Sequence, residues 1–339
     1  MKFIIPVLLA FSLASCTIIP SAQERNSVRI PVGPGPEDIA LDTTSTSYPR
    51  LLASCLQRRK GLPEFNEICE VNLNDDTYKI MKRSNEPAGM VFRPHGIDLV
   101  KNTKGELLLY CVSHNELQNE HSIIVYNVLA DRLVFKEKMD SPLLVSPNDV
   151  TASCTGELFV TNDAGKRGNA TEQLLKLKRS NVIHYNPDSK QWDIAADRVA
   201  YANGVAVNKC PADYAVFSTV RSNRVYIIEP SKTGNNKFTK RTIARLKGLD
   251  NITFVNSNEI LVTAHLRQLA YIKHYKDAKN ISPTVVYKVS LITGKSSAVY
   301  TNDGSAICGG STALMYKGKM YIAQVFEPFL LKCDAEDVK

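Results

Sequence analysis

The chain has 339 residues, 44% of them hydrophobic and 22% charged, and a formal net charge of +8 at pH 7. These proportions are ordinary for a soluble globular protein and argue against a disordered chain, and after the first twenty residues no apolar run is long enough to span a bilayer. The basic clusters at residues 58–60 and 176–179 lack the interleaved aromatic side chains of a nucleic-acid groove, so no nucleic-acid partner is expected.

Residues 1–22 are typical of an export signal. Lys2 precedes an apolar stretch at residues 3–13, which is too short to cross a membrane as a helix. The stretch ends in LASC, which resembles a bacterial lipobox and would make Cys16 the acylated first residue of a membrane-anchored lipoprotein. The alternative is an ordinary signal cleaved near Ala22. The sequence therefore predicts an exported protein, which is a periplasmic or outer-membrane lipoprotein if the host is bacterial and a secreted protein otherwise.

Seven cysteines remain when Cys16 is set aside. An odd number in a chain expected in an oxidising compartment leaves at least one thiol free or paired outside the chain. Cys55 and Cys69 flank a polar connection between two strand-like runs and are the first choice for an internal disulfide. The other candidate pairs are Cys308 with Cys333 and Cys154 with Cys210.

Six short phrases recur along the chain, roughly fifty residues apart, and each places polar side chains just before an apolar, strand-like run. In chain order they read GPEDIAL, RPHGIDL, SPNDVTA, YANGVAV, GLDNITF and GGSTALM. Such a period indicates one supersecondary unit used six times. The polar pairs are Glu37-Asp38, His95-Gly96, Asn148-Asp149, Asn203-Gly204, Asp250-Asn251 and Gly310-Ser311.

Within each repeat, the phrase is followed by a turn and by further β-branched and aromatic runs. The third repeat continues from DVTAS through Thr155-Gly156 to ELFVTND and NVIHYN. Roughly four strands per repeat suit a propeller blade, and six repeats suit six blades. The sequence therefore predicts an all-β fold, a six-bladed β-propeller over residues 23–339, with a short helix at residues 171–178 capped by Thr171 as a local exception.

The polar pairs are expected to converge, because the innermost strand of each blade lines the central channel. A buried polar group without a partner costs about 1–3 kcal/mol, so water, mutual hydrogen bonds or an ion must fill the channel. Five side chains of the common frame offer only oxygen atoms, two as carboxylates, which favours calcium with its roughly six to eight oxygen ligands. The alternative is that they are turn and capping residues. The predicted ligands are Glu37, Asn148, Asn203, Asp250 and Asn251.

Asp38 and Asp149 adjoin two of these ligands. Alternation along an extended chain turns their side chains away from the first ion. They predict a second, more buried calcium that joins blades from within, with backbone carbonyls at residues 95–97 as further ligands. The alternative is that both carboxylates only accept hydrogen bonds from amides at strand ends.

Two histidines are expected at the channel mouth. His95 belongs to the second polar pair, and His114 ends the next strand of the same blade. Paired imidazoles beside a cation can move a proton to and from water near neutral pH. His265 ends the corresponding strand of the fifth repeat and is a substrate-pocket candidate, with a structural role as the alternative. No function is expected for His121, His184 and His274.

With these motifs the sequence resembles the paraoxonase and arylesterase family, and more distantly the gluconolactonase-like six-bladed propellers. The resemblance covers residues 36–333 and is most specific in PEDIAL, RPHGIDL, LYCVSHN, PNDVTA, FVTND, YANGVAVN, LDNITF and GGSTALMYKGKMYIAQVF. It implies hydrolysis of small-molecule lactones and aryl esters with a catalytic calcium on the five ligands above. It also implies a structural calcium on Asp38, Asp149 and the carbonyl of Ile97, and a catalytic His95–His114 dyad, with Asp250 as a rival base or nucleophile.

The sequence departs from the family at the closure of the propeller. The family commonly uses a disulfide from the N-terminal region to a cysteine matching Cys333, but no cysteine lies between Thr17 and Ser54. Closure is therefore expected to rely on strand pairing or on another bridge. Two other functions remain open at this point: a non-catalytic, calcium-stabilised propeller for ligand binding or scaffolding, and a condensing enzyme like the strictosidine-synthase relatives.

Overall fold

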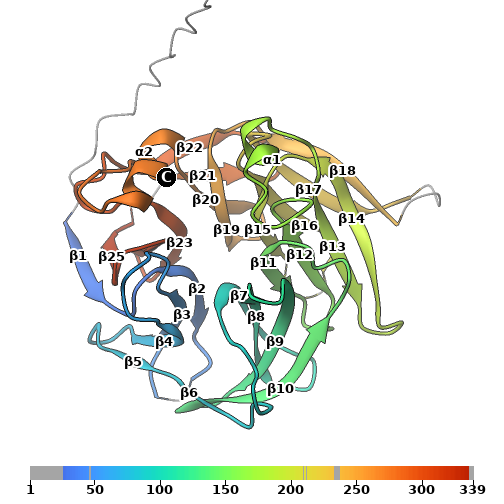
Figure 1. Ribbon diagram of the computed structural model, residues 1–339, viewed down its shortest axis with the longest axis horizontal. Coiled ribbons are helices and arrows are strands. Elements are labelled where there is room, and N and C mark those ends of the chain that lie inside the picture. Colours follow the sequence, from blue (N-terminus) through green and yellow to red (C-terminus); the bar gives the residue numbers. More distant parts are fainter. Residues whose placement is uncertain (1–25, 46, 209, 211, 233–236, 336–339) are drawn as a thin grey trace, which may run out of the picture.

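The computed structural model describes residues 26–45, 47–208, 210, 212–232 and 237–335, so the predicted signal segment and Cys16 lie outside the described residues. Six β-sheets surround a central axis in Figure 1, and the predicted all-β, six-bladed propeller is confirmed. The described residues contain no helix that is both long and apolar enough to cross a membrane.

Each blade runs outward from the axis in chain order, because antiparallel neighbours can be joined by short turns. The first blade consists of β2 (Pro36–Asp42), β3 (Arg50–Leu56), β4 (Asn66–Asn72) and β5 (Tyr78–Ile80). The second consists of β7 (Pro94–Lys101), β8 (Leu107–Asn115), β9 (Glu120–Val128) and β10 (Arg132–Asp140), with β6 (Lys82–Ser84) parallel to β10. The third consists of β11 (Pro147–Ala152), β12 (Leu158–Asn162), β13 (Ser180–Asn186) and β14 (Gln191–Val199).

The remaining blades follow the same plan. The fourth blade consists of β15 (Ala202–Val207), β16 (Ala215–Thr219), β17 (Arg224–Pro230) and β18 (Phe238–Ala244). The fifth consists of β19 (Leu249–Asn256), β20 (Glu259–Ala264), β21 (Thr284–Ser290) and β22 (Ser296–Asn302). The sixth consists of β23 (Gly310–Tyr316), β24 (Lys319–Gln324) and β25 (Phe329–Asp334), and β1 (Ser27–Pro31) completes it.

The N-terminal strand closes the ring. β1 pairs antiparallel with β25, with Ser27 opposite Cys333, so the two ends of the described chain share the sixth blade (Figure 1). Ile30 of β1 is fully buried in the apolar contact between the sixth and first blades. Closure by strand pairing, one of the two expected solutions, is therefore what the structure shows.

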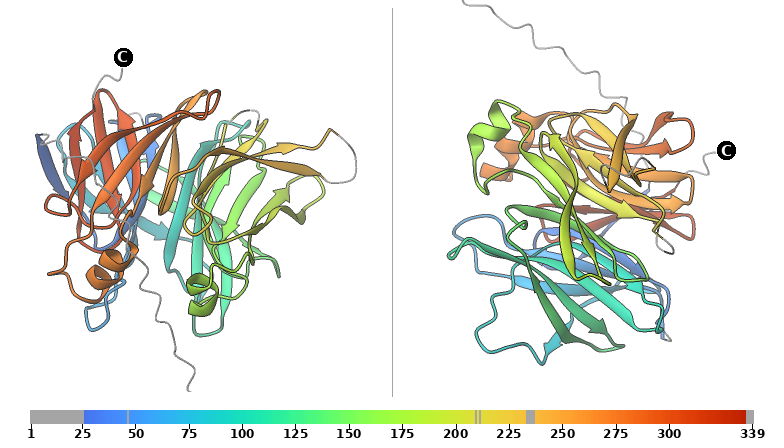
Figure 2. Two further views of the ribbon diagram at one scale, coloured as in Figure 1. Left: turned by 90° about the horizontal axis from the view of Figure 1, so that it is seen from above. Right: turned by 90° about the vertical axis from the view of Figure 1, so that its right-hand side faces the viewer.

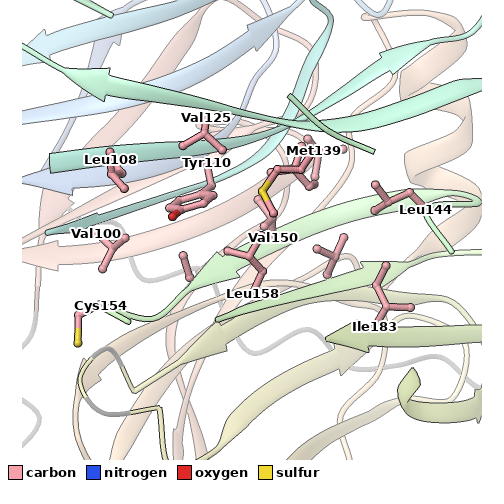
Figure 3. Packing of buried hydrophobic residues seen from close by; sticks show 14 residues of the cluster. Val100, Leu108, Tyr110, Val125, Met139, Leu144, Val150, Cys154, Leu158 and Ile183 are labelled. Atoms are coloured by element: carbon pink, nitrogen blue, oxygen red, sulfur yellow. The ribbon is translucent and has the colours of Figure 1, made fainter. Parts of the chain in front are cut away.

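The core lies between neighbouring blades, which pack face to face. Figure 3 shows this contact between the second and third blades, where Tyr110 and Val125 approach Val150 and Leu158. Strands in the middle of a blade are buried on both faces and therefore read as nearly continuous apolar runs, as β8 does. The outer strand β10 is mostly exposed or half-buried instead, and only Leu133 and Met139 in it are buried.

Two helices lie on one face of the propeller (Figure 2). α1 (Ala170–Leu174) confirms the helix expected in the loop of the third blade, but it begins earlier, because the Asn169 side chain accepts a hydrogen bond from Thr171 N and acts as the cap. α2 (Gln268–Lys276), between β20 and β21, was not predicted. Both helices lie in loops that follow the second strand of a blade.

The disulfide prediction was wrong in its order of preference. Cys154 and Cys210 form a disulfide that joins the third and fourth blades, with Cα atoms 5.4 Å apart. Cys55 faces Glu67 and Cys69 faces Ala53 across β3 and β4, so the first-choice pair is diagonal rather than opposite and both residues remain thiols. Their thiols are nevertheless within hydrogen-bond reach of each other, so the structure shows a contact between them but no disulfide. Cys308 is also a thiol, so its predicted bond to Cys333 is not formed.

Replacing both Cys154 and Cys210 by serine is expected to lower the free energy of unfolding by about 2–4 kcal/mol, because the bond closes a loop with a sequence separation of 56 residues. Denaturant titration measures the loss, and a reducing agent should produce the same loss in the unsubstituted protein. Cys308→Ser is the matched control, since that half-buried thiol has no disulfide. Equal unfolding midpoints for the double variant and the unsubstituted protein would contradict the expectation.

Candidate metal and active site

The polar pair of each blade occupies the second and third positions of the innermost strand. In all six blades the pairing with the next strand is irregular at these positions, for example between Pro147 and Val150 of β11. Such bulges re-aim side chains beside functional sites. In β23 the same register selects Ser311 and Thr312, so the predicted pair of the sixth repeat was one residue too early.

Six of the predicted site residues line one cavity of about 320 Å³ on the face that carries α2. Five come from the second position of an innermost strand, and the sixth follows β20. Because five different blades contribute, the site exists only when the ring is closed. These six residues are Glu37, His95, Asn148, Asn203, Asp250 and His265.

Four buried side-chain oxygens at this site have no hydrogen-bond partner among the described residues. They belong to Glu37 (Oε2), Asn148 (Oδ1), Asn203 (Oδ1) and Asn251 (Oδ1), whose exposed fractions are 3–6%. Asn251 does not line the cavity itself, but it donates through Nδ2 to Glu37 Oε1 at 3.1 Å, and Glu37 does line it. Since each buried oxygen without a partner costs about 1–3 kcal/mol, the group fits a hard cation.

Carboxylates alone do not make this site. The described residues contain no group of three or more His, Cys, Asp or Glu side chains that could hold a metal. The amide oxygens of Asn148, Asn203 and Asn251 are therefore essential to the predicted set, as expected for calcium rather than for zinc.

Buried negative charge accumulates around the channel. Burial, together with the nearby Asp38 and Asp250 carboxylates, raises the pKa of Glu37 to about 8, although Arg58 opposes the shift. Burial likewise raises the pKa of Asp38 to about 7, against hydrogen bonds that favour its charged form. The pKa of Asp149 is raised well above its usual range by burial and by Asp38. A divalent cation would favour all three charged forms.

Asp38 and Asp149 connect neighbouring blades. Asp38 Oδ2 accepts from Ile97 N at 2.7 Å, and Asp149 Oδ2 accepts from Val205 N at 2.7 Å. These are the amide hydrogen bonds of the alternative interpretation. Asp38 Oδ1 also accepts from Ile39 N and from Thr312 Oγ1, each at 2.9 Å. A second cation would relieve the repulsion between the two buried carboxylates, and its binding here stays a prediction.

Glycine in the second and fourth polar pairs makes room for the next blade. A Cβ atom on Gly96 would lie 2.5 Å from both Cα and Oδ1 of Asp149, and one on Gly204 would lie 2.5 Å from Cα of Asn251. Because each glycine has no side chain, the innermost strand of the next blade, which carries a candidate ligand, can pack directly against the glycine backbone.

His95 and His114 meet as predicted. His95 Nδ1 lies 3.0 Å from His114 Nε2, and His95 Nε2 lies 3.8 Å from Glu37 Oε2. Burial, with help from Arg58 and Arg167, lowers the pKa of both histidines well below the usual range. Both imidazoles are therefore neutral at neutral pH, and a neutral imidazole can accept a proton. Their catalytic role stays a prediction.

His265 contacts a predicted ligand. Its Nε2 lies 2.6 Å from Asp250 Oδ2, and both side chains line the cavity. Its ring also packs on Tyr271 of α2, with centroids 4.5 Å apart.

Sequence reasoning missed several residues of the site. Arg58, Tyr201 and Phe326 line the cavity from three loops and Tyr271 lines it from α2, and no local pattern marks residues that meet only in the fold. It also assigned no role to His121, whose Nδ1 lies 3.1 Å from His114 Nδ1. The available signal was the hairpin HNELQNEH, which places the two histidines opposite each other on β8 and β9.

Comparison with known proteins identifies relatives of this chain by sequence. The family model described as Arylesterase matches residues 25–334. The human protein "Serum paraoxonase/arylesterase 2" is 26% identical over 69% of this chain and 67% of its own length. The human "Serum paraoxonase/lactonase 3" is also 26% identical, over 71% and 68%.

Solved structures show the same fold at low sequence identity. A luciferin-regenerating enzyme superposes with a TM-score of 0.59 and 11% identity, covering 93% of this chain and 97% of its own. A gluconolactonase from Xanthomonas campestris superposes with a TM-score of 0.58 and 12% identity, covering 94% and 91%. The family model spans nearly the whole propeller, and on that evidence the chain belongs to the arylesterase family.

Proposed function

We propose that this protein is a calcium-dependent hydrolase of lactones and aryl esters, and that the 320 Å³ cavity is its active site. One observation carries the proposal: four buried oxygens without hydrogen-bond partners in the described structure converge beside a pair of neutral histidines. Membership of the arylesterase family supports the reaction class. The human relatives named as arylesterase and lactonase support the two kinds of substrate.

The channel residues would hold two calcium ions. The catalytic ion would be bound by Glu37, Asn148, Asn203, Asp250 and Asn251. A structural ion would be bound by Asp38, Asp149 and the carbonyl of Ile97. When bound, the catalytic ion supplies a Lewis acid that polarises the ester carbonyl and stabilises the negative charge that develops on its oxygen.

His95 is the proposed general base. Its Nδ1 is engaged by His114, so Nε2 is the nitrogen available to take a proton from the attacking water. A bond forms between the water oxygen and the carbonyl carbon, and the bond to the leaving oxygen then breaks. His95 returns a proton to the leaving alkoxide. His114 holds the ring of His95 in position and sets which of its nitrogens carries hydrogen.

Asp250 is the second candidate for the base. Its carboxylate faces the cavity, but its Oδ2 is already bonded to His265 Nε2 at 2.6 Å. The contact with His265 and the proposed calcium both occupy oxygens of the Asp250 carboxylate, so this carboxylate is less available than His95 to accept a proton. The aromatic rings of Tyr201, Tyr271 and Phe326 provide apolar contact for an aryl or acyl group.

The test is hydrolysis of a panel of lactones and phenyl acetate by the purified protein, with calcium and with a chelator. Calcium-dependent turnover is the expected result. If the calcium-bound protein hydrolyses none of these substrates, a non-catalytic propeller is favoured instead. Condensation of an amine with an aldehyde would favour an enzyme like the strictosidine-synthase relatives.

We also propose that the protein is exported and anchored to a membrane through lipid on Cys16, on the evidence of residues 1–22 alone. Cys16→Ala is expected to move the protein from the membrane fraction to the soluble fraction. Ser15→Ala is the matched control, because it retains the thiol and the short apolar stretch. Continued membrane association of the Cys16→Ala protein would contradict lipidation.

A further inference from the structure

Three histidines of the second blade form a continuous chain. His95 Nδ1 lies 3.0 Å from His114 Nε2, and His114 Nδ1 lies 3.1 Å from His121 Nδ1. The ring centroids are 5.2 Å and 5.0 Å apart. His114 and His121 are opposite each other in the β8–β9 pairing, so the sheet itself holds the second link.

Burial makes these contacts specific. His114 is 2% exposed and His121 is 6% exposed, so solvent does not compete for the nitrogens between them. A neutral imidazole has one N–H donor and one acceptor nitrogen. Both nitrogens of His114 are engaged, and the three rings therefore donate in one direction along the chain.

The chain connects two cavities. His95 lines the proposed active-site cavity, and His121 lines a second cavity of about 680 Å³ with Lys138, Asp140 and Arg167. Arg167 borders both cavities and lies 3.6 Å from Glu116. His121 Nε2 is buried and has no hydrogen-bond partner in the described part of the chain, so it is the unengaged end of the series.

The charges around His121 keep it neutral at rest. Burial is the main cause, and with Arg167 it lowers the pKa of His121 to about 4, although Glu116 opposes the shift. His121 is therefore a neutral imidazole near neutral pH, with one donor and one acceptor nitrogen.

We propose that His121 is the third member of this chain and moves protons between the active site and the second cavity, on the side away from the substrate. The inference rests on the proposed hydrolysis. When water gives a proton to His95 Nε2, the Nδ1 proton of His95 moves to His114 Nε2. The Nδ1 proton of His114 then moves to His121 Nδ1, and the Nε2 proton of His121 leaves to solvent.

The reverse sequence restores the chain. His95 Nε2 gives its proton to the leaving alkoxide, and a proton from solvent returns through His121 and His114 to His95 Nδ1. Each ring carries one proton before and after the cycle, so no imidazolium needs to accumulate beside the proposed calcium. His121 acts through His114 and is a positioning and relay residue, because it does not touch the substrate cavity.

The experiment compares His121→Phe and His121→Asn with the unsubstituted protein, loaded with calcium and assayed with phenyl acetate. Both variants are expected to lose about tenfold or more in kcat with little change in KM. Added imidazole is expected to restore part of kcat in the variants and to leave the unsubstituted protein unaffected. The matched control is His184→Asn, because His184 is a buried histidine that contacts Glu157 and is not one of the three connected histidines.

A second measurement does not depend on activity. Nitrogen-15 NMR of the ring nitrogens is expected to show one dominant tautomer of His114, and a mixture of tautomers in His121→Phe. Unchanged kcat in both folded variants, or a loss that imidazole does not restore, would overturn the relay. If His121→Phe does not fold, His121→Asn decides. If the unsubstituted protein hydrolyses no ester, the proposed function fails, and the NMR result alone decides whether His121 sets the tautomer of His114.

Discussion

Removal of calcium is expected to abolish hydrolysis of lactones and phenyl acetate and to lower the unfolding temperature, more strongly at pH 8 than at pH 5. The reason is the buried charge of the channel. Without a cation, burial raises the pKa of Glu37 from 4.5 to about 8 and that of Asp38 from 3.8 to about 7. The folded protein then binds more protons than the unfolded chain between about pH 4 and pH 8.

The sign of the pH effect follows from this difference in bound protons. The free energy of unfolding falls with rising pH wherever the native state holds the extra protons. The calcium-free protein should therefore lose stability, on the order of several kcal/mol, as pH rises through this window. Bound calcium keeps both carboxylates charged and should remove most of the dependence. Differential scanning calorimetry at several pH values, with calcium and with a chelator, measures the effect.

A ligand variant separates the metal from general effects of chelation. Asn148→Ala removes one of the oxygens without a partner and should weaken calcium binding, measured by titration calorimetry, and reduce kcat with it. Asn186→Ala is the control, because Asn186 is the last residue of β13 and is not a predicted ligand. This variant should bind calcium normally. Full lactone turnover after thorough removal of calcium would overturn the mechanism.

His95→Gln is expected to lower kcat by about 10²–10⁴ and to change KM little. Loss of a positioned general base has this magnitude, and glutamine keeps a polar side chain of similar size beside His114. Because burial lowers the pKa of His95, the loss of activity on the acid side should occur at a lower pH than the titration of an ordinary histidine, whose pKa is about 6.5. Steady-state kinetics from pH 5 to pH 9 measures both effects.

The two candidate bases differ in how they couple to the metal. Asp250→Asn should reduce calcium affinity as well as kcat, since the same carboxylate is a predicted ligand, whereas His95→Gln should bind calcium normally. His184→Gln is the control for loss of a buried histidine. An unchanged kcat in His95→Gln, together with a calcium-saturated Asp250→Asn protein that is inactive, would assign the base to Asp250 instead.

Several features of the site could be predicted because they are local and repeated. The second position of five innermost strands, from Glu37 to Asp250, was recognisable from the phrases alone, since each phrase begins its strand and sets a polar pair before an apolar run. The His95–His114 contact followed from placing both residues at one end of adjacent strands of one blade. The sixth phrase was misaligned by one residue, because its Gly310-Ser311-Thr312 run contains no charged side chain to mark the bulge.

Other features needed the register between strands or the meeting of distant loops. Cys55 and Cys69 have a favourable spacing, but the β3–β4 register makes them diagonal neighbours, and the disulfide forms between Cys154 and Cys210 instead. Arg58 and Tyr271 line the same cavity although more than two hundred residues separate them. His121 extends the histidine pair because the β8–β9 hairpin places it opposite His114.

The sequence by itself determined the period, the blade count, the oxygen-rich choice of side chains and the family resemblance. All of these depend on residue type at a regular spacing, which strand alternation and turn preference impose within each repeat. Only the tertiary structure decided which cysteines pair, which loops line the cavity and how far the histidine chain extends. Those contacts join segments whose separation is set by strand register and by the pairing of β1 with β25, and neither leaves a local signal in the chain.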